Sequence, residues 1–156
     1  MSNVMINNEI GITFADSFSE MSEQELTRYF GSPADRWGAY DAERHIILSV
    51  GWKKAGFLQS DPEMHLFELQ SRLRRSLLNF QQITTYKTKI ASAKKDNASG
   101  VRFEYRVKDS VRVHVVDLIV FKHKKNFYAV YFVSRKANAA AVRTDLQQIL
   151  QSVTLN

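Results

Sequence analysis

The chain has 156 residues, a formal net charge of +6 and no cysteine. Its length fits a single domain, residues 1–156, whose core needs no support from disulfides or metals. The lack of cysteine excludes disulfides, thiolate metal sites and cysteine nucleophiles. The first nine residues lack the basic and apolar regions of a signal peptide, and no stretch approaches the roughly 18 apolar residues that span a bilayer. We therefore expect a cytoplasmic protein.

Charge is divided unevenly between the two halves of the chain. Residues 1–78 hold 11 acidic and 8 basic residues, whereas residues 79–156 hold 5 acidic and 14 basic residues. The basic half could attract nucleic acid, anionic lipid or an acidic protein surface. A plainer interpretation is that Lys and Arg keep exposed strand faces in water and protect the edges of a sheet.

The first half of the chain predicts four strands and two helices. Apolar alternation places strands at Val4–Ile6, Ile10–Phe14, Trp37–Tyr40 and Ile46–Trp52. The two helices are indicated by capping residues at their starts.

Each of these two helices has a capping signal. Ser22 and Glu25 match a capping box, which predicts a helix to about Phe30. Asp61 followed by Pro62 predicts a second helix, which we expect to run to Asn79. The side chains expected to be buried are Leu26, Tyr29 and Phe30 in the first helix, and Leu66, Leu69, Leu73, Leu77 and Phe80 in the second.

The second half predicts four strands and a closing helix. The strands are expected at Ile83–Ala93, Val101–Lys108, Val111–Lys122 and Phe127–Arg135. The third and fourth are apolar on both faces, which is typical of central strands covered on both sides. The closing helix, Ala139–Ser152, has Asn138 in position to cap it and an apolar stripe formed by Val142, Leu146, Ile149, Leu150 and Val153.

These elements follow the order ββ-α-ββ-α-ββββ-α and predict an α+β fold, with an antiparallel β-sheet packed with helices. The order resembles the PsbP-like fold, which is shared by the extrinsic protein of the oxygen-evolving complex, a Ran-binding nuclear transport factor and bacterial DcrB-like proteins. The parts that carry this resemblance are the hairpin Val4–Phe14, the helix Pro62–Asn79, the meander Ile83–Arg135 and the closing helix Ala139–Ser152.

The resemblance implies a function but no site. Members of this fold act by binding other proteins, including as adaptors or chaperones, more often than by catalysis. They share no catalytic set, so no functional residue is transferred to this chain.

No motif in the sequence indicates a catalytic or metal site. The four histidines, His45, His65, His114 and His123, have no metal-ligand spacing, and the six glycines form no phosphate-binding loop. His114 is expected in the core or an interface, and His123 in solvent. Asp117 lies inside an apolar strand, where we expect a structural contact with Arg102, Arg106 or Arg112. We predict no cofactor.

Another protein is therefore the expected partner. Bulky apolar residues next to glycines suit a partner surface, and the strand arginines could contribute charge. The candidate contact residues are Trp52, Phe57, Leu58, Arg102, Arg106 and Arg112. The working hypothesis is a non-enzymatic protein-interaction module of a bacterial cell, possibly an adaptor or a chaperone.

Two alternatives stay open. One is nucleic-acid or polyanion binding through the basic C-terminal sheet, from Arg102 to Lys125. In an ideal strand, however, Phe103 and Tyr105 lie opposite the arginines, which separates stacking rings from charge. The other is an enzyme with a dispersed active site. The sequence does not indicate an oligomeric state.

Overall fold

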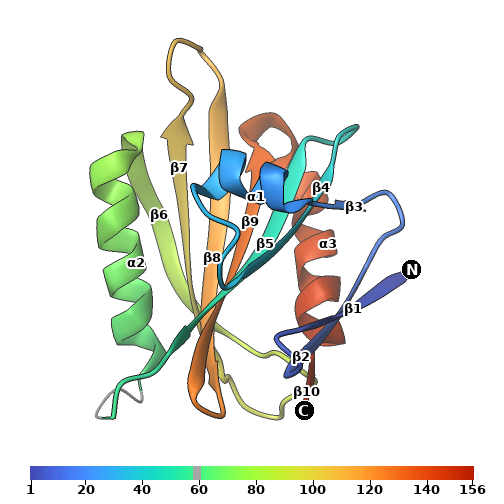
Figure 1. The fold of residues 1–156 in the computed structure, drawn as a ribbon. Coiled ribbons are helices and arrows are strands. Elements are labelled where there is room, and N and C mark those ends of the chain that lie inside the picture. The colour runs from blue at the N-terminus through green and yellow to red at the C-terminus, as the bar shows by residue number, and fades with distance from the viewer. Residues whose placement is uncertain (58–60) are drawn as a thin grey trace.

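The computed structural model describes residues 1–57 and 61–156, and these parts form two antiparallel sheets and three α-helices (Figure 1). The larger sheet has the strand order β3-β4-β5-β9-β8-β7-β6. Its strands are β3 (Ser19–Glu20), β4 (Arg36–Asp41), β5 (Ile46–Lys54), β6 (Leu78–Thr88), β7 (Ala98–Arg106), β8 (Val113–His123) and β9 (Asn126–Arg135). The predicted α+β class with an antiparallel sheet is confirmed.

A second, smaller sheet joins the two ends of the chain. The predicted hairpin is present as β1 (Ser2–Ile6) and β2 (Ile10–Phe14), and β10 (Thr154–Leu155) pairs with the free side of β2. Neither β10 nor β3 was expected, because two-residue strands are too short to show a period in the sequence. Pairing with a partner far along the chain creates them.

The helices are α1 (Glu23–Phe30), α2 (Pro62–Ser76) and α3 (Ala139–Ser152), with a short 3₁₀ turn, η1 (Lys136–Asn138), before α3. The capping box of α1 is confirmed in both directions, since the Glu25 N–H donates to the Ser22 hydroxyl and the Ser22 N–H donates to the Glu25 carboxylate. Two expectations were wrong. Tyr29 is 49% exposed, because α1 has one narrow buried side centred on Leu26. Asn138 precedes α3, but its side chain makes no capping hydrogen bond.

The boundary between α2 and β6 lies earlier than predicted. The helix ends at Ser76 rather than Asn79, and the strand covers Leu78–Thr88 rather than Ile83–Ala93. The reason is pairing with the neighbouring strand, because Leu78 already lies opposite Arg106 of β7. β7 likewise begins at Ala98, before the expected start, because its ladder with β6 extends to Thr88.

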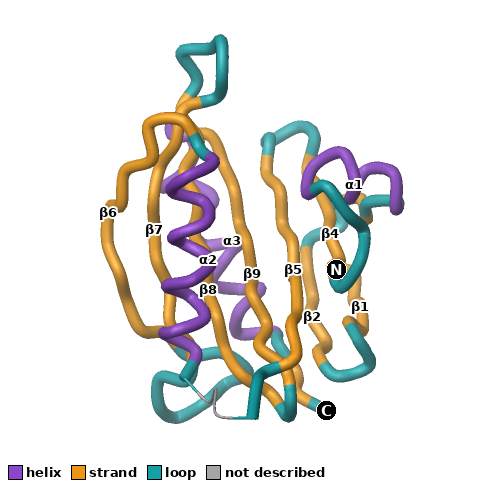
Figure 2. The backbone as a smooth tube through the Cα atoms, turned by 60° about the vertical axis from the view of Figure 1, so that its left-hand side comes forward, coloured by secondary structure: helices purple, strands orange, loops and turns teal. Residues whose placement is uncertain are grey.

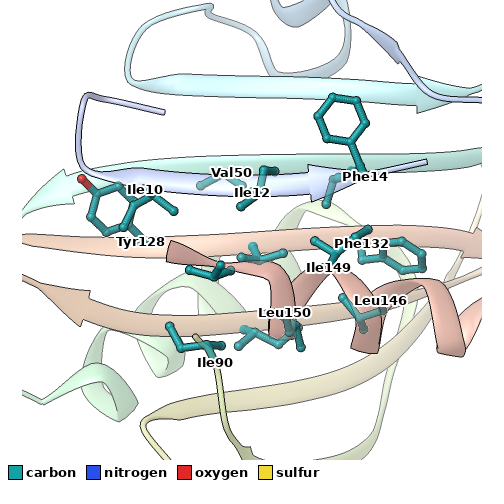
Figure 3. Packing of buried hydrophobic residues seen from close by; sticks show 14 of the residues in the cluster. Ile10, Ile12, Phe14, Val50, Ile90, Tyr128, Phe132, Leu146, Ile149 and Leu150 are labelled. Carbon is teal, nitrogen blue, oxygen red and sulfur yellow. The ribbon is translucent and has the colours of Figure 1, made fainter. Parts of the chain in front are cut away.

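The two faces of the larger sheet are covered differently. Helix α2 lies over β7 and β8 on one face, whereas α3 and the small sheet lie on the other (Figures 1 and 2). We call the α2 side the open face and the α3 side the closed face. Figure 3 shows the closed-face core, in which side chains from β2 meet those of α3 and of the larger sheet.

The central strands carry apolar residues on both faces, as predicted. In β8, Leu118 belongs to the core under α2, whereas Ile119 and Phe121 belong to the closed-face core. The predicted stripe of α2 also packs on the sheet, with Leu66 buried and its other members partly buried. Among the described residues, no helix combines the length and the apolarity that crossing a membrane would require.

Candidate functional site

An apolar groove lies on the open face between α1, α2 and the strands β5 and β9. Its volume is about 460 Å³. One wall comes from Leu69, Leu73 and Leu77 of α2, and the opposite wall comes from Tyr29 and Phe30 at the end of α1. No carboxylate is among the described residues that line it. The groove exists because α2 covers only part of this face, so that a strip of sheet between the two helices stays accessible.

Arg36 of β4 lies in this groove and is held in place by three neighbours. Its guanidinium stacks over the Phe30 ring at 4.3 Å from the centroid, and its Nη1 donates to the Ser49 hydroxyl at 2.7 Å. The third neighbour is Gly51, which lies opposite Arg36 in the β4–β5 ladder. A Cβ on Gly51 would come within 3.2 Å of the guanidinium, so the absence of a side chain leaves room for Arg36.

The charge of Arg36 has no counter-charge in the parts of the chain that the structure describes. The ion pairs found among residues 1–57 and 61–156 do not include it. Burial lowers the pKa of Arg36 from its usual value, although the side chain remains cationic at neutral pH. A partly buried cation without a partner carries a desolvation cost that a bound anion would offset.

Two tyrosines extend the polar part of the groove, and a histidine lies beside one of them. Burial raises the pKa of Tyr131 well above its usual value, so that its hydroxyl keeps its proton. The hydroxyl has no hydrogen-bond partner among the described residues. Nearby on the same face, the Tyr105 hydroxyl lies 3.1 Å from Nδ1 of His114. Burial lowers the pKa of His114, so that the neutral ring is favoured at pH 7.

On the closed face, by contrast, a buried carboxylate is paired with an arginine. Asp117 is 6% exposed and accepts from Nε of Arg102 at 3.0 Å and from the Tyr86 hydroxyl at 2.9 Å. The predicted structural contact of Asp117 is therefore present, and Arg102 is the arginine that makes it. Tyr86 reaches this position across Gly100, whose missing side chain leaves space for the ring.

A second charged group ties the turn between β4 and β5 to α3. Arg44 donates to Asp41 at 2.7 Å and to both carboxylate oxygens of Asp145 at 3.0 Å. Two opposing effects act on the pKa of Asp41. Burial by itself would raise this pKa, but the hydrogen bonds from Arg44 and Ser17 lower it by more, so the pKa lies below its usual value. These contacts serve the fold rather than a ligand.

Of the six residues predicted to contact a partner, the five that the structure describes do not converge on one site. Phe57 is fully exposed in the segment before α2, whereas Trp52 is partly buried against the closed-face core. Leu58 lies outside the described residues. Arg106 and Arg112 lie at the β7–β8 turn, at the other end of the sheet (Figure 1). Arg102 is the partly buried partner of Asp117. That any of the six contacts a partner stays a prediction.

The basic residues of the second half do not form one face either. Lys124 and Lys125 form the β8–β9 turn, at the end of the sheet away from Arg106 and Arg112. The neighbouring rings Phe103 and Tyr105 point to the α2 side, away from Arg102, as the alternation predicted. The arrangement does not supply the continuous basic groove with stacking aromatics that single-strand binders use.

Helix α2 carries exposed apolar side chains on its outer side. Met64 is 64% exposed and Phe67 is 69% exposed, one helical turn apart. Phe67 borders a pocket of about 410 Å³ between α2 and the strands β6 and β7. We call Phe57, Met64 and Phe67 the outer α2 surface. Met64 and Phe67 were not singled out from the sequence, although both are apolar residues that lie off the predicted core stripe and could have indicated this surface.

Three histidines have structural neighbours. His65 is buried and stacks on Phe127 with 4.9 Å between the centroids. His114 is partly buried beside Tyr105, whereas His123, expected in solvent, lies 2.7 Å from the carbonyl oxygen of Asn156. The described residues contain no group of three or more His, Asp or Glu side chains that could hold a metal ion.

Arg36 was missed because the sequence predicted a strand that begins one residue later. An arginine at the edge of a predicted strand looks like an ordinary solvated charge. The only signal was its place in the alternation, since it must lie on the face opposite Trp37. That this face is a groove depends on where α1 and α2 lie.

No family model and no curated protein matches this sequence. Solved structures match over nearly the whole chain. Cyanobacterial PsbP (CyanoP) from Synechocystis sp. PCC 6803 has a TM-score of 0.70 at 10% identity, covering 99% of this chain and 92% of that one. The Ran-binding protein Mog1p of Saccharomyces cerevisiae has a TM-score of 0.66 at 9% identity, covering 99% and 96%.

A third similar structure is LpqN of Mycobacterium tuberculosis, described as involved in cell envelope biogenesis. Its TM-score is 0.64 at 13% identity, covering 94% of this chain and 83% of that one. At such low identity the similarity concerns the architecture and not the site residues. The order of elements, the two faces of the sheet and these comparisons lead to one conclusion: the chain has the PsbP-like fold, in the form also seen in Mog1p.

Proposed function

We propose that this protein is a non-enzymatic protein-interaction module, an adaptor or chaperone of the cytoplasm, and that it binds its partner through the outer α2 surface. The observation that carries the proposal is the exposure of Phe57, Met64 and Phe67 around the start of one helix. Large apolar side chains gathered on a surface are typical of protein–protein contacts. Aromatic residues and methionine are also enriched at the centres of such interfaces.

The surface has the features that a partner needs. Phe67 stands beside a pocket of about 410 Å³, so a partner side chain can enter next to it. Asp61 and Pro62 begin α2 with a capping hydrogen bond from the Glu63 N–H, which holds the exposed side chains on a rigid element. An ion pair between Glu63 and Lys87 connects this turn to β6.

Comparison with known proteins supports the same class of function by analogy of fold. Mog1p, which shares the architecture, is a Ran-binding protein. The proposal that this chain is not an enzyme also fits the charged groups of its closed face, because Asp41 and Asp117 are engaged in ion pairs within the fold. Fold analogy alone does not identify the partner.

The proposal is tested by crosslinking at a defined position in the native cell. A photoreactive phenylalanine analogue placed at Phe67 should crosslink one specific protein, which is identified by mass spectrometry. The same analogue at Val111 is the matched control, because Val111 is 85% exposed but lies at the distant β7–β8 turn.

The crosslinked protein should then bind the purified chain, and Phe67→Ser with Met64→Ser should weaken this binding at least tenfold. Val111→Ser should leave it unchanged. Crosslinks that are equally strong at both positions, or a partner whose affinity ignores both α2 substitutions, would contradict the proposed surface.

A further inference from the structure

We propose that the groove between α1 and α2 binds a small amphipathic carboxylate, whose carboxylate group pairs with Arg36 and whose apolar body lies along the leucines of α2. This site lies on the inner side of α2, apart from the outer α2 surface. The inference therefore goes beyond the proposed function and stands or fails separately from it.

The first argument is charge complementarity. Arg36 is a cation in an apolar groove, with no acidic residue among the described residues that line it. Arg72 of α2, at the exposed rim of the groove, adds a second positive charge. Partly burying an arginine without a counter-ion is costly, and an anion bound to Arg36 would offset that cost.

The second argument is preorganisation. The guanidinium is held between the Phe30 ring, the Ser49 hydroxyl and the backbone of Gly51, so its direction does not depend on the ligand. Only Nη1 is used by Ser49, and the other guanidinium nitrogens form no hydrogen bond to a described residue. A planar carboxylate matches the geometry of such a guanidinium better than a spherical anion does.

The third argument is a second donor beside the first. The Tyr131 hydroxyl belongs to the same groove, keeps its proton and has no partner among the described residues. Arg36 stacks over the Phe30 ring, and the Tyr131 ring packs edge-on against the same Phe30 with 6.2 Å between the centroids, so the two groups lie on the same part of the groove. A guanidinium and a neutral hydroxyl together can satisfy the two oxygens of one carboxylate.

Size and lining favour a small ligand over a protein segment. The volume of about 460 Å³ lies within the range of roughly 300–1,000 Å³ that is typical of small-molecule pockets. Apart from Arg36, Arg72 and Ser76, the lining consists of aliphatic side chains and aromatic rings. An anionic head with an aliphatic or aromatic body matches both parts.

Dodecanoate is a suitable probe, used below its micelle concentration with the purified full chain. Isothermal titration calorimetry should show binding at one site, and dodecanol and dodecyltrimethylammonium should bind at least tenfold more weakly. In methyl-labelled protein, the NMR signals of Leu69, Leu73 and Ile47 should shift on titration, because these residues line the groove. This comparison of ligands needs no variant, so it holds even if a substitution disturbs folding.

Variants locate the site. Arg36→Met should weaken dodecanoate at least tenfold and leave dodecanol unchanged, because it removes the charge and keeps the apolar length. Ala129→Leu, which fills the floor of the groove, should weaken both ligands. Lys125→Met is the control, because it removes an exposed cation of the β8–β9 turn, at the end of the sheet away from the groove residue Tyr105, and should change neither.

Several results would overturn the proposal. Equal affinity for dodecanoate and dodecanol would show that Arg36 does not select an anion. Absence of binding, or NMR shifts outside the groove, would remove the site itself. If an apolar peptide with a central glutamate binds in the groove and dodecanoate does not, the groove belongs to a protein partner instead. None of these results bears on crosslinking at Phe67.

Discussion

The two faces of the seven-stranded sheet are built from the same strands, but the buried carboxylates of the closed face and the cation in the groove of the open face differ in their partners. On the closed face, Asp117 pairs with Arg102, and Arg44 joins Asp41 to Asp145 on α3. On the open face, Arg36 and the hydroxyl of Tyr131 lie in an apolar groove and have no ion-pair partner among residues 1–57 and 61–156. Because unpaired polar groups cost stability, a fold retains them where they serve another purpose. The ion pairs of the closed face therefore connect elements that are distant along the chain, whereas the groove of the open face holds a cation with no counter-charge among the described residues.

The largest expected effect compares one leucine from each face. Leu146 of α3 is 3% exposed in the closed-face core, whereas Leu73 of α2 lines the groove and is only partly buried. We expect Leu146→Ala to lower the free energy of unfolding by about 3 kcal/mol and Leu73→Ala by about 1 kcal/mol. Both substitutions are made within a helix, so differences in helix propensity cancel. Urea denaturation followed by circular dichroism measures both, and equal losses would contradict the distinction between the faces.

A smaller and pH-dependent effect is expected from Asp41. Its pKa is lower in the folded state than in the unfolded chain, so the ionised carboxylate stabilises the fold. This contribution is present above the unfolded-state value of about 3.9 and is lost as the pH falls through the folded-state pKa. Asp41→Asn should cost about 2 kcal/mol at pH 7, because hydrogen bonds between charged partners are lost.

The cost of Asp41→Asn should shrink as the pH falls below about 4, since the wild-type carboxylate is then protonated as well. Unfolding curves at pH 7, 5 and 3 test this, because these values lie on both sides of the usual carboxyl pKa of roughly 4. Glu23→Gln on exposed α1 is a suitable control. A cost that does not change with pH would mean that the charge of Asp41 is unimportant.

The smallest effect is expected for Arg36→Met. Removing the cation relieves a desolvation cost but also removes the stacking on Phe30 and the hydrogen bond to Ser49. These changes oppose each other, so the free energy of unfolding should change by less than about 1 kcal/mol. Arg44→Met on the closed face should cost more, because it leaves Asp41 buried without its partner. If Arg36→Met lowers the free energy of unfolding more than Arg44→Met does, the role of Arg36 is structural.

Local patterns in the sequence predicted much of the fold. The capping box at Ser22 and Glu25 and the start of α2 at Asp61 were correct, because a capping residue and the backbone N–H that it binds are neighbours in the chain. The strands β8 and β9 were also recognised as central, since a strand covered on both sides must be apolar on both sides. The order of the elements was enough to suggest the PsbP-like fold.

The boundaries that were wrong depend on distant partners. Helix α2 ends at Ser76 because the residues after it pair with β7. The strand β10 forms because it pairs with the side of β2 that β1 leaves free. No local pattern contains that information.

The sequence by itself determined the class of the fold, the stripes that face the core and the absence of cysteine chemistry, since each is a property of neighbouring residues. Only the tertiary structure decided which charges are paired. Arg102 and Arg36 are both strand arginines, and their environments differ because Arg102 meets Asp117 of the neighbouring strand on the closed face, whereas Arg36 lies in the space that α1 and α2 leave uncovered. Pairing and solvation depend on the elements that the fold brings together, which are far apart along the chain.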